Sequence, residues 1–460
     1  MPTGIADVFA GCDPSKEALV TASQSLTYAE LDAASARAAG ALAAMGVKAG
    51  DRVAACLAND VEVVAAFHGA MRLGAIWVGV SKALAPPERQ FILDDSGAGV
   101  FLDDDAALRE AIAAAAPREA AEVDPFAPAG IAYTSGTTGY PKGAVHSQHN
   151  LLLPGHMLVE SRGWDASLRK GDCFALTILN MQVLTTLTTA QCGGTSVVMD
   201  RIDAQGVAAW IRNEQVTVWN GPPALLHSLA HDDAIASSDL VSLREVWTGG
   251  ADCPEAIRTA FEHKFGLPVL ATYGLTEAPT VVSIDPPHGP HVDTASGRPL
   301  PHLRVRIADD DEICVSPADD RYRPMLGYWN RDDATTETLR DGELHTGDVG
   351  FVDDEGYLHV RDRKSLVIIR GGANVYPAEV ERVLQEFDGV VASAVIGVAD
   401  ERLGERVVAL VEGDADEDKL RDYCLANLAK YKVPERFVFV DSFPRNAMNK
   451  IVRKELHGLL

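Results

Sequence analysis

The first hundred residues alternate between helical and strand-like patterns of apolar positions. Residues 28–45 and 61–72 carry apolar side chains, many of them alanine, at helical spacing. The short apolar runs at 52–57 and 76–80 predict strands. Strands that alternate with helices in this way indicate a parallel, wound α/β architecture.

The α/β pattern extends through the middle of the chain. Residues 216–219, 245–247 and 269–272 are apolar runs that predict buried strands. From about Arg304 onward the pattern changes to short alternating strands and turns, as in LRVRIADDDEICV and GFVDDEGYLHV. We therefore expect a large N-terminal α/β domain that is built from more than one subdomain.

A charged junction at 361–364 separates this part from a smaller α+β unit, which begins with the apolar SLVII and a Gly-Gly turn. The predicted helices and strands of the smaller unit lie at 378–387, 390–398, 419–428 and 436–440. We predict an N-terminal domain at 1–362, a hinge at 363–366 and a small C-terminal domain at 367–460.

Length and charge narrow the possible functions. A chain of 460 residues is too long for one simple core, so two or three domains are expected. The formal net charge of −25 argues against a general binder of nucleic acid or of anionic membranes. The charge does not exclude a phosphate ligand, because such sites are built locally from backbone dipoles and a few cations.

The cysteines and the N-terminal residues indicate the cellular compartment that we expect for the protein. The seven cysteines are scattered, with no CxxC pair and no metal-ligand spacing, which is typical of reduced thiols in a cytosol. The start MPTGIADVFAGCDPSKE has Asp7 within its only apolar stretch and no basic beginning, so no signal peptide is predicted. No uninterrupted apolar run reaches the roughly 18 residues of a membrane helix. We expect a soluble cytoplasmic protein.

A loop of small residues, YTSGTTGYPKG at 133–143, is the first candidate for chemistry. It follows the apolar residues 131–133 and therefore leaves the end of a predicted strand, where ligands gather in wound sheets. Small residues let backbone N–H groups converge on an anion, and a lysine adds positive charge. The spacing differs from the common nucleotide loop GxxxxGK[ST], so from the residues alone a phosphate cradle and a mobile surface loop both remain open.

Five further segments accompany this loop in a fixed order. They are WTGGADCPE (247–255), ATYGLTEA (271–278), GELHTGDVG (342–350), DRKSLVIIRGGANVYPAEVE (362–381) and PRNAMNKIVRKEL (444–456). Together with the loop they resemble the motif series of the adenylate-forming superfamily, which includes acyl-CoA synthetases, adenylation domains and beetle luciferases. The resemblance extends over nearly the whole chain from residue 50 onward and is closest to the acyl-CoA synthetases. It favours the phosphate-cradle interpretation of the loop.

The resemblance implies a two-step ligase reaction. ATP and a carboxylic acid give an acyl-adenylate and pyrophosphate, and the acyl group then passes to a thiol, usually that of coenzyme A. Glu277, on a turn with Thr276, would position Mg²⁺ together with Thr138. The residues that would hold the phosphates are Thr134, Ser135, Gly136, Thr137, Thr138 and Lys142.

The same resemblance assigns the nucleoside and the moving domain. The residues expected to line the adenine pocket are Gly249, Gly250, Ala251, Thr272, Tyr273 and Gly274. Asp348 would accept hydrogen bonds from the ribose, and Arg363 would reach ribose or phosphate. Lys450 would bridge the attacking carboxylate and the α-phosphate, where charge gathers in the transition state. In the family the small C-terminal domain is mobile, and its rotation would present Gly371 and Gly372 to the pantetheine tunnel.

Each of these side chains also has a purely structural interpretation. Glu277 could cap or pair locally, Asp348 could belong to a turn, and Tyr273 could serve the core. Lys450 could be a solvated charge in a basic tail. We interpret His146 and His149 as structural, because no metal-ligand constellation surrounds them.

Two positions depart from the family pattern near the predicted hinge and lysine. Asn449 stands where the residue before the lysine is usually glycine, and Ser365 stands at a hinge position that is usually Asp or Lys. Asparagine tolerates positive φ better than other non-glycine residues but adds bulk. A displaced Lys450 would weaken adenylation first, so one alternative is an enzyme that mainly thioesterifies an acyl-adenylate.

The predicted acid-binding wall is the third departure. The segment ALTILNMQVL (175–184) contains neither the histidine of many acyl-CoA synthetases nor the aspartate of amino-acid-activating relatives. The predicted pocket residues are Leu179, Met181, Val183, Leu184 and Asn220. Their apolar majority favours a bulky hydrophobic acid, although ordinary core packing would give the same residue types.

Three further alternatives remain open from the sequence. The acyl group could pass to the phosphopantetheine of a carrier protein instead of coenzyme A. The chain could also be a non-catalytic protein that binds nucleotide or adenylate, although the joint presence of the motif residues argues against this. The acid itself and the oligomeric state, monomer or homodimer, are not readable from the sequence.

Overall fold

The fold is taken from a computed structural model of the chain. It describes residues 1–134, 141–249, 253–287, 292–370, 373–400, 402–445 and 450–460. Among the described helices, none combines the length and the apolarity required to cross a membrane.

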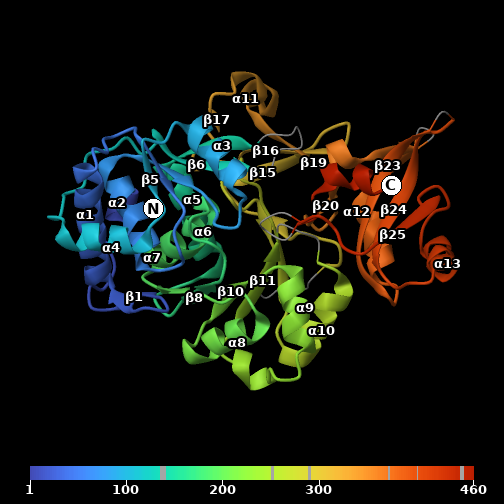
Figure 1. Cartoon of the computed structure of the whole chain (residues 1–460), viewed down its shortest axis with the longest axis horizontal. Helices are drawn as coiled ribbons and strands as arrows, with labels where there is room; N and C mark the ends of the chain where they lie inside the picture. Colours follow the sequence, from blue (N-terminus) through green and yellow to red (C-terminus); the bar gives the residue numbers. More distant parts are fainter. Residues whose placement is uncertain (135–140, 250–252, 288–291, 371–372, 401, 446–449) are drawn as a thin grey trace.

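A six-stranded sheet forms the core of the first lobe (Figure 1). In spatial order its strands are β17 (Gly327–Tyr328), β7 (Lys142–Ser147), β6 (Pro128–Thr134), β4 (Ile76–Gly79), β3 (Arg52–Ala55) and β5 (Val100–Leu102). The strands from β5 to β6 run parallel, whereas β7 pairs antiparallel with β6 and β17 pairs antiparallel with β7. Strands β6 and β7 are therefore antiparallel neighbours beside the parallel part of the sheet.

A nine-stranded sheet forms the core of the second lobe. In spatial order its strands are β14 (Arg298–Pro299), β13 (Ser283–Ile284), β12 (Val269–Tyr273), β11 (Glu245–Gly249), β10 (Val218–Asn220), β8 (Arg169–Asp172), β9 (Thr195–Val198), β1 (Glu17–Val20) and β2 (Ser25–Thr27). The six strands from β12 to β1 are parallel, so their carboxyl ends lie along one edge. Ligands of wound sheets bind at such an edge.

Helices form the layers that cover and separate the two sheets. Around the sheets lie α1 (Tyr28–Ala44), the fully buried α2 (Val61–Leu73), α3 (Pro86–Ser96), α4 (Asp105–Ala114), α8 (Ala204–Asn213), α9 (Pro223–His231) and α10 (Glu255–Phe265). A central group contacts strands of both sheets: α5 (Gln148–Arg162), α6 (Leu179–Gln182), the π-helical η2 (Val183–Leu187) and α7 (Thr188–Cys192). The segment predicted as the acid-binding wall thus lies between the sheets.

The boundaries of the first helices follow from local chemistry. Thr27 accepts a hydrogen bond from the Glu30 N–H while the Glu30 carboxylate accepts one from the Thr27 N–H, which together form a capping box at the start of α1. The Asp60 side chain caps α2, and Gly74 ends it with a φ of +68° that glycine adopts without strain. Every residue of α2 is buried, including the polar Glu62, His68 and Arg72.

The last third of the chain forms two smaller sheets. The first contains β15 (Leu303–Ile307), β16 (Glu312–Pro317), β18 (Leu339–Arg340), β19 (Glu343–Val352) and β20 (Leu358–Arg363), with α11 (Asp332–Thr338) beside it. After η4 (Lys364–Leu366) follow β21 (Ile368–Arg370), β22 (Ala373–Val375), α12 (Pro377–Gln385), β23 (Val390–Asp400), β24 (Gly404–Gly413), α13 (Glu417–Asn427), β25 (Arg436–Val440) and η5 (Arg453–Leu459). This final unit stands apart at one side of the molecule (Figure 1).

The expected α/β fold is confirmed, with a large N-terminal and a smaller C-terminal part. Each strand and helix predicted from apolar spacing has a counterpart within a few residues. The antiparallel pairings, such as that of β7 with β6 and that of β1 with β2, were not anticipated from the sequence. The domain boundary at 363–366 stays a prediction, and the start of a separate sheet at β21 supports it.

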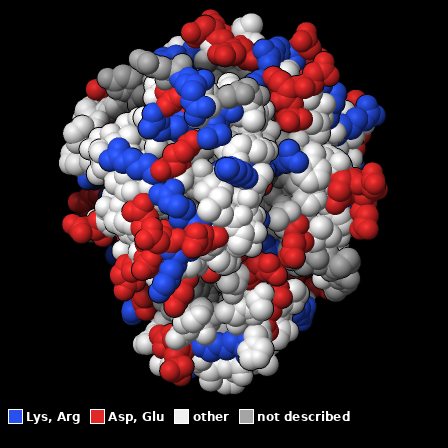
Figure 2. All heavy atoms as spheres, turned by 90° about the vertical axis from the view of Figure 1, so that its right-hand side faces the viewer, with Lys and Arg blue, Asp and Glu red and all other residues white. Residues whose placement is uncertain are grey.

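The surface on the C-terminal side carries mixed charges. On the face shown in Figure 2, acidic and basic side chains are interspersed over the visible surface. All seven cysteines are free thiols, and five of them are buried.

A buried histidine in α2 links stability to pH. His68 is 2% exposed and packs against Phe9 and Phe67, with ring centroids 4.7 and 5.4 Å away. Burial, and second the charge of Arg72, lower the pKa of His68 from 6.5 to about 3. Because the unfolded chain binds this proton first, the stability is complete above pH 6.5 and is lost as the pH falls from there toward 3.

We expect His68 alone to lower the free energy of unfolding by about 2 kcal/mol between pH 7.5 and pH 5. Urea unfolding at both pH values would measure this difference. Trp77 can report unfolding by fluorescence, because it is buried and its ring lies 5.7 Å from that of Phe67, which packs against His68. The variant His68→Leu should show a pH-dependent loss that is smaller by this amount. The exposed His457 offers a matched control, and His457→Leu should keep the wild-type difference. An unchanged pH difference in His68→Leu would contradict the assignment.

Candidate active site

Tyr328 brings two of the predicted site residues together. Its hydroxyl donates a 2.6 Å hydrogen bond to Oε1 of Glu277, and Nζ of Lys142 lies 5.1 Å from its ring centroid. Burial, reinforced by the charge of Glu277, raises the pKa of the Tyr328 phenol well above its ordinary value, so the phenol remains a donor. The arrangement places a cation over the ring and a carboxylate at the hydroxyl of one tyrosine.

The position of Lys142 follows from the β6–β7 hairpin. Lys142 is the first residue of β7 and pairs with Thr134, the last residue of β6. The Thr134 hydroxyl lies 3.4 Å from the Lys142 carbonyl oxygen, which closes the base of the connection. The predicted phosphate residues Ser135, Gly136, Thr137 and Thr138 lie outside the described residues.

A second cluster joins three residues that are distant in sequence. The Tyr273 hydroxyl donates a 2.5 Å hydrogen bond to Oδ2 of Asp348, and Nε of Arg363 lies 2.7 Å from Oδ1 of the same carboxylate. Asp348 and Arg363 are direct partners across β19 and β20, which explains their approach. Tyr273 reaches them from the end of β12.

Electrostatic effects connect the two clusters. Burial raises the pKa of Asp348 despite the opposing effects of Arg363 and Tyr273, and the charge of Glu277 raises it further. Burial also raises the pKa of Tyr273 well above its ordinary value. Since Glu277 acts on Asp348, the two clusters belong to one electrostatic environment.

The glycines beside these clusters permit close approach of neighbouring chain segments. A Cβ on Gly249 would lie 2.6 Å from the Thr272 carbonyl oxygen, and one on Gly274 would lie 1.7 Å from the Thr280 carbonyl oxygen. The Thr272 hydroxyl donates to the Ser283 carbonyl oxygen, so its role here is to join β12 to β13. The predicted adenine-pocket residues Gly250 and Ala251 lie outside the described residues.

The two histidines after the loop are held by backbone groups. Burial lowers the pKa of His146 to about 4, and a hydrogen bond with the Thr276 backbone opposes the effect. Nε2 of His149 lies 2.7 Å from the Arg321 carbonyl oxygen. Both contacts are structural, and the first fixes the turn that carries Thr276 and Glu277.

Lys450 of the C-terminal unit lies close enough to Arg363 for the two positive charges to interact. Burial of its ammonium lowers the pKa of Lys450, and the positive charge of Arg363 is the second cause, although the residue as a whole retains exposed surface. The adjoining Arg453 forms a two-pronged ion pair with Glu381 of α12 at 2.7–2.8 Å, which fixes this end of the segment. Asn449 lies outside the described residues.

The segment predicted as a hinge is tied to the large domain by Lys364. Its Nζ lies 2.5 Å from Asp310 and 3.2 Å from Glu312. Ser365 follows within η4. The predicted pantetheine residues Gly371 and Gly372 lie outside the described residues.

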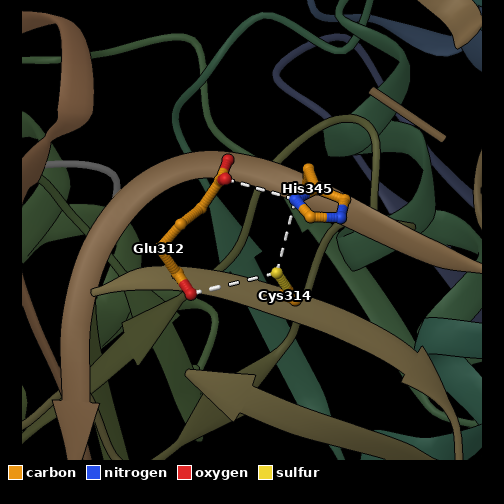
Figure 3. Close-up of side chains that lie close together, drawn as sticks. All are labelled: Glu312, Cys314 and His345. Carbon is orange, nitrogen blue, oxygen red and sulfur yellow. Dashed lines mark hydrogen bonds and ion pairs between the residues drawn. The ribbon is translucent and has the colours of Figure 1, made fainter. Parts of the chain in front are cut away.

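Glu312 also belongs to a cluster with Cys314 and His345 (Figure 3). Nδ1 of His345 lies 3.2 Å from Glu312 and 3.5 Å from the Cys314 sulfur, so these three groups have the types and proximity of a metal site. The Glu312 carboxylate is already compensated, because it accepts the Gly347 N–H and pairs with Lys364. Lys364 supplies the positive charge that a metal would supply. We therefore interpret the cluster as structural, because it holds Lys364 and the Gly347 backbone in place.

The predicted acid-wall residues pack into the interior. Leu179, Met181 and Val183 belong to the hydrophobic core of the first lobe, and Leu184 packs against it with part of its surface exposed. A Cβ on Gly130 of β6 would lie 2.6 Å from a Leu179 methyl group. This packing does not distinguish a pocket wall from ordinary core.

Asn220 differs from these residues because it is polar. It ends β10, at the carboxyl edge of the second sheet, and its Oδ1 accepts a 2.6 Å hydrogen bond from Nζ of Lys170.

Lys170 was not anticipated from the sequence, and neither was Tyr328. A fully buried lysine has no sequence signature, whereas Tyr328 lies in the aromatic run Gly327–Asn330, which offered a weak signal.

Comparison with known proteins adds an independent line of evidence. The model of the AMP-binding enzyme family matches residues 7–321, and that of the AMP-binding enzyme C-terminal domain matches residues 379–450. The chain is 34% identical to the long-chain-fatty-acid–CoA ligase FadD13 of Mycobacterium tuberculosis, over 94% of this chain and 92% of that protein. It is 36% identical to the feruloyl-CoA synthase of an Amycolatopsis species, over 94% and 93% of the two chains.

Solved structures show the same similarity. The o-succinylbenzoate CoA synthetase from Bacillus subtilis, in complex with its acyl-adenylate intermediate, is 31% identical with a TM-score of 0.90. The match covers 99% of this chain and 98% of that one.

Proposed function

Because this chain belongs to the AMP-binding enzyme family, we propose that it is an ATP-dependent acid–CoA ligase. It activates a carboxylic acid as an acyl-adenylate and then transfers the acyl group to coenzyme A. One observation carries the proposal. Lys142, Glu277, Asp348 and Arg363, drawn from distant parts of the sequence, converge in two adjoining clusters, and the charge of Arg363 acts on Lys450 of the C-terminal unit.

The first step joins two anions and therefore needs cations. An oxygen of the substrate carboxylate attacks the α-phosphorus of ATP, and the bond to pyrophosphate breaks. Lys142 lies at the loop proposed to hold the outer phosphates, and Lys450 would neutralise charge that gathers between carboxylate and α-phosphate. Asp348, fixed by Tyr273 and Arg363, would accept the ribose hydroxyls.

The surroundings of Glu277 fit a magnesium ion. Mg²⁺ prefers oxygen ligands, and within the described residues only one oxygen of this half-buried carboxylate has a hydrogen-bond partner, Tyr328. Glu277, with Thr138 of the loop, would hold the ion, which would neutralise phosphate charge when bound. Tyr328 orients the carboxylate for that purpose.

In the second step the thiol of coenzyme A attacks the acyl carbonyl carbon, and AMP leaves. For this step we propose that the C-terminal unit rotates at 363–366, withdraws Lys450 and brings Gly371 and Gly372 to the thiol's path. The ion pairs of Lys364 with Asp310 and Glu312 would have to rearrange in such a movement.

For the acid, we propose a bulky and largely hydrophobic body. The apolar character of Leu184 and its neighbours in the core between the sheets supports this. The relative FadD13 is named for a long-chain fatty acid, which is largely apolar. Transfer to a carrier-protein phosphopantetheine remains the alternative for the second step, and loading assays with each acceptor would separate the two.

ATP–pyrophosphate exchange with Mg²⁺ tests the proposal. We expect exchange that depends on one class of acid in a panel of short, medium, long, aryl and polycyclic acids. The same acid should then give a CoA thioester. Failure of exchange in protein that converts supplied acyl-adenylate and CoA to thioester would instead support a specialised enzyme of the second step. ATP binding without turnover of acid, adenylate or thiol would reject both.

A further inference from the structure

A buried polar cluster lies where the two sheets meet behind the acid wall. Lys170 and Asp172 of β8 are both 0% exposed, and Nζ of Lys170 lies 2.7 Å from Oδ2 of Asp172. The hydroxyl of Thr185, in the π-helical turn, donates to the same oxygen of Asp172. Nζ of Lys170 also reaches Oδ1 of Asn220 at 2.6 Å and lies 5.9 Å from the Trp247 ring centroid. The cluster thus connects the acid-wall segment with strands β8, β10 and β11.

The cluster fixes how Asn220 presents its amide. A lysine ammonium can only donate, so the oxygen of the amide must face Lys170 and the NH₂ group must face away. Within the described residues no partner exists for that NH₂ group, and Asn220 retains exposed surface. Asn220 ends β10 directly beside Trp247 of β11, the strand that leads to Gly249. A hydrogen-bond donor is therefore held at the edge where the acid is proposed to bind.

The cluster has further unused hydrogen-bonding capacity. Oδ1 of Asp172 is buried and has no hydrogen-bond partner among the described residues. Buried polar atoms without partners are uncommon and destabilising, so a site that contains one is suited to a polar ligand group. The charges of Lys170 and Asp172 cancel, which leaves little net attraction for a second carboxylate and favours a neutral group.

We propose that the acid carries a neutral oxygen substituent, a hydroxyl or carbonyl group on its apolar body, which Asn220 recognises through its NH₂ group. This inference rests on the proposed function, because it assumes that the acid lies beside β10. Lys170 and Asp172 are positioning residues for Asn220. The site then combines an apolar wall with one oriented hydrogen bond, and a substrate lacking the oxygen would leave the donor unpaired.

The experiment compares acids with the same skeleton that differ only in this oxygen. The panel contains the unsubstituted acid and its hydroxy and keto forms at successive positions, and kcat/KM is measured by ATP–pyrophosphate exchange. We expect at least one oxygenated form to exceed the unsubstituted acid by about tenfold, the factor that one ordinary hydrogen bond supplies. The variant Asn220→Leu should reduce this ratio to about one.

Lys170→Met tests the positioning role through the same ratio. Loss of a merely structural contact would lower kcat/KM equally for both acids, whereas loss of positioning should lower the oxygenated acid selectively. Lys264→Met is the matched control, because Lys264 donates to the backbone oxygens of Leu229 and Asp232 and does not contact the cluster. It should leave the ratio at the wild-type value.

Two outcomes would overturn the inference: no oxygenated form exceeding the unsubstituted acid, or Asn220→Leu retaining the wild-type preference. Exchange with acids but without this preference would reject the inference and leave the proposed function standing. If no acid supports exchange, the proposed function fails, and calorimetric binding of paired acyl-sulfamoyl adenosines decides the inference separately. A tenfold tighter binding of the oxygenated analogue would support it, and equal binding would reject it.

Discussion

Replacing Lys450 with alanine is expected to lower ATP–pyrophosphate exchange by about 10²- to 10³-fold, the effect of removing one oriented charge at a developing anion. Thioester formation from supplied acyl-adenylate and CoA should change by no more than about threefold, because the lysine is proposed to act only in the first step. The lysine belongs to the C-terminal unit and interacts with the charge of Arg363, a residue proposed to reach ribose or phosphate. Single-turnover measurement of each half-reaction gives the two rates separately.

Lys454→Ala is the matched control for this experiment. Lys454 is an exposed lysine four residues further along the same segment. Its replacement removes the same charge and should leave both half-reactions near the wild-type rates. An equal loss of both half-reactions in Lys450→Ala would indicate general damage to the C-terminal unit and would contradict the proposed role.

The helices and strands of the α/β core could be predicted from the sequence, because each has a recognisable pattern of apolar residues. The buried helix α2 and the parallel strands β3 and β4 have apolar runs of the length and spacing that the packing requires. Strand β7 was less visible, because its KGAVHS sequence is mixed in character although it pairs with both β6 and β17. Local pattern therefore predicts elements better than it predicts strand direction.

Side-chain convergence was only partly predictable. Asp348 and Arg363 were assigned through motifs, and strand pairing explains their contact. The Lys170–Asp172 pair could not be anticipated, because an alternating Lys-Gly-Asp segment predicts an exposed face and burial depends on the facing π-helical turn. Long-range packing supplied what spacing alone could not.

Replacing Glu277 with glutamine is expected to lower ATP–pyrophosphate exchange by about 10²- to 10³-fold at fixed Mg²⁺. Glutamine keeps the shape and can still accept the hydrogen bond from Tyr328, so the change removes mainly the negative charge. A role in holding Mg²⁺ depends on that charge, whereas local capping or pairing does not. The Mg²⁺ concentration that gives half-maximal exchange should therefore rise together with the loss of rate.

Tyr328→Phe separates the charge of Glu277 from its orientation. This variant removes the 2.6 Å hydrogen bond and retains both the carboxylate and the aromatic ring beside Lys142. We expect a loss of about tenfold or less, because one hydrogen bond is removed and the carboxylate can still reach the ion. If Tyr328→Phe were as damaging as Glu277→Gln, or if Glu277→Gln left the Mg²⁺ dependence unchanged, Glu277 would serve local structure instead of the metal. A selective effect of the charge would place the metal at the junction of the two clusters, where Glu277 already acts on Asp348.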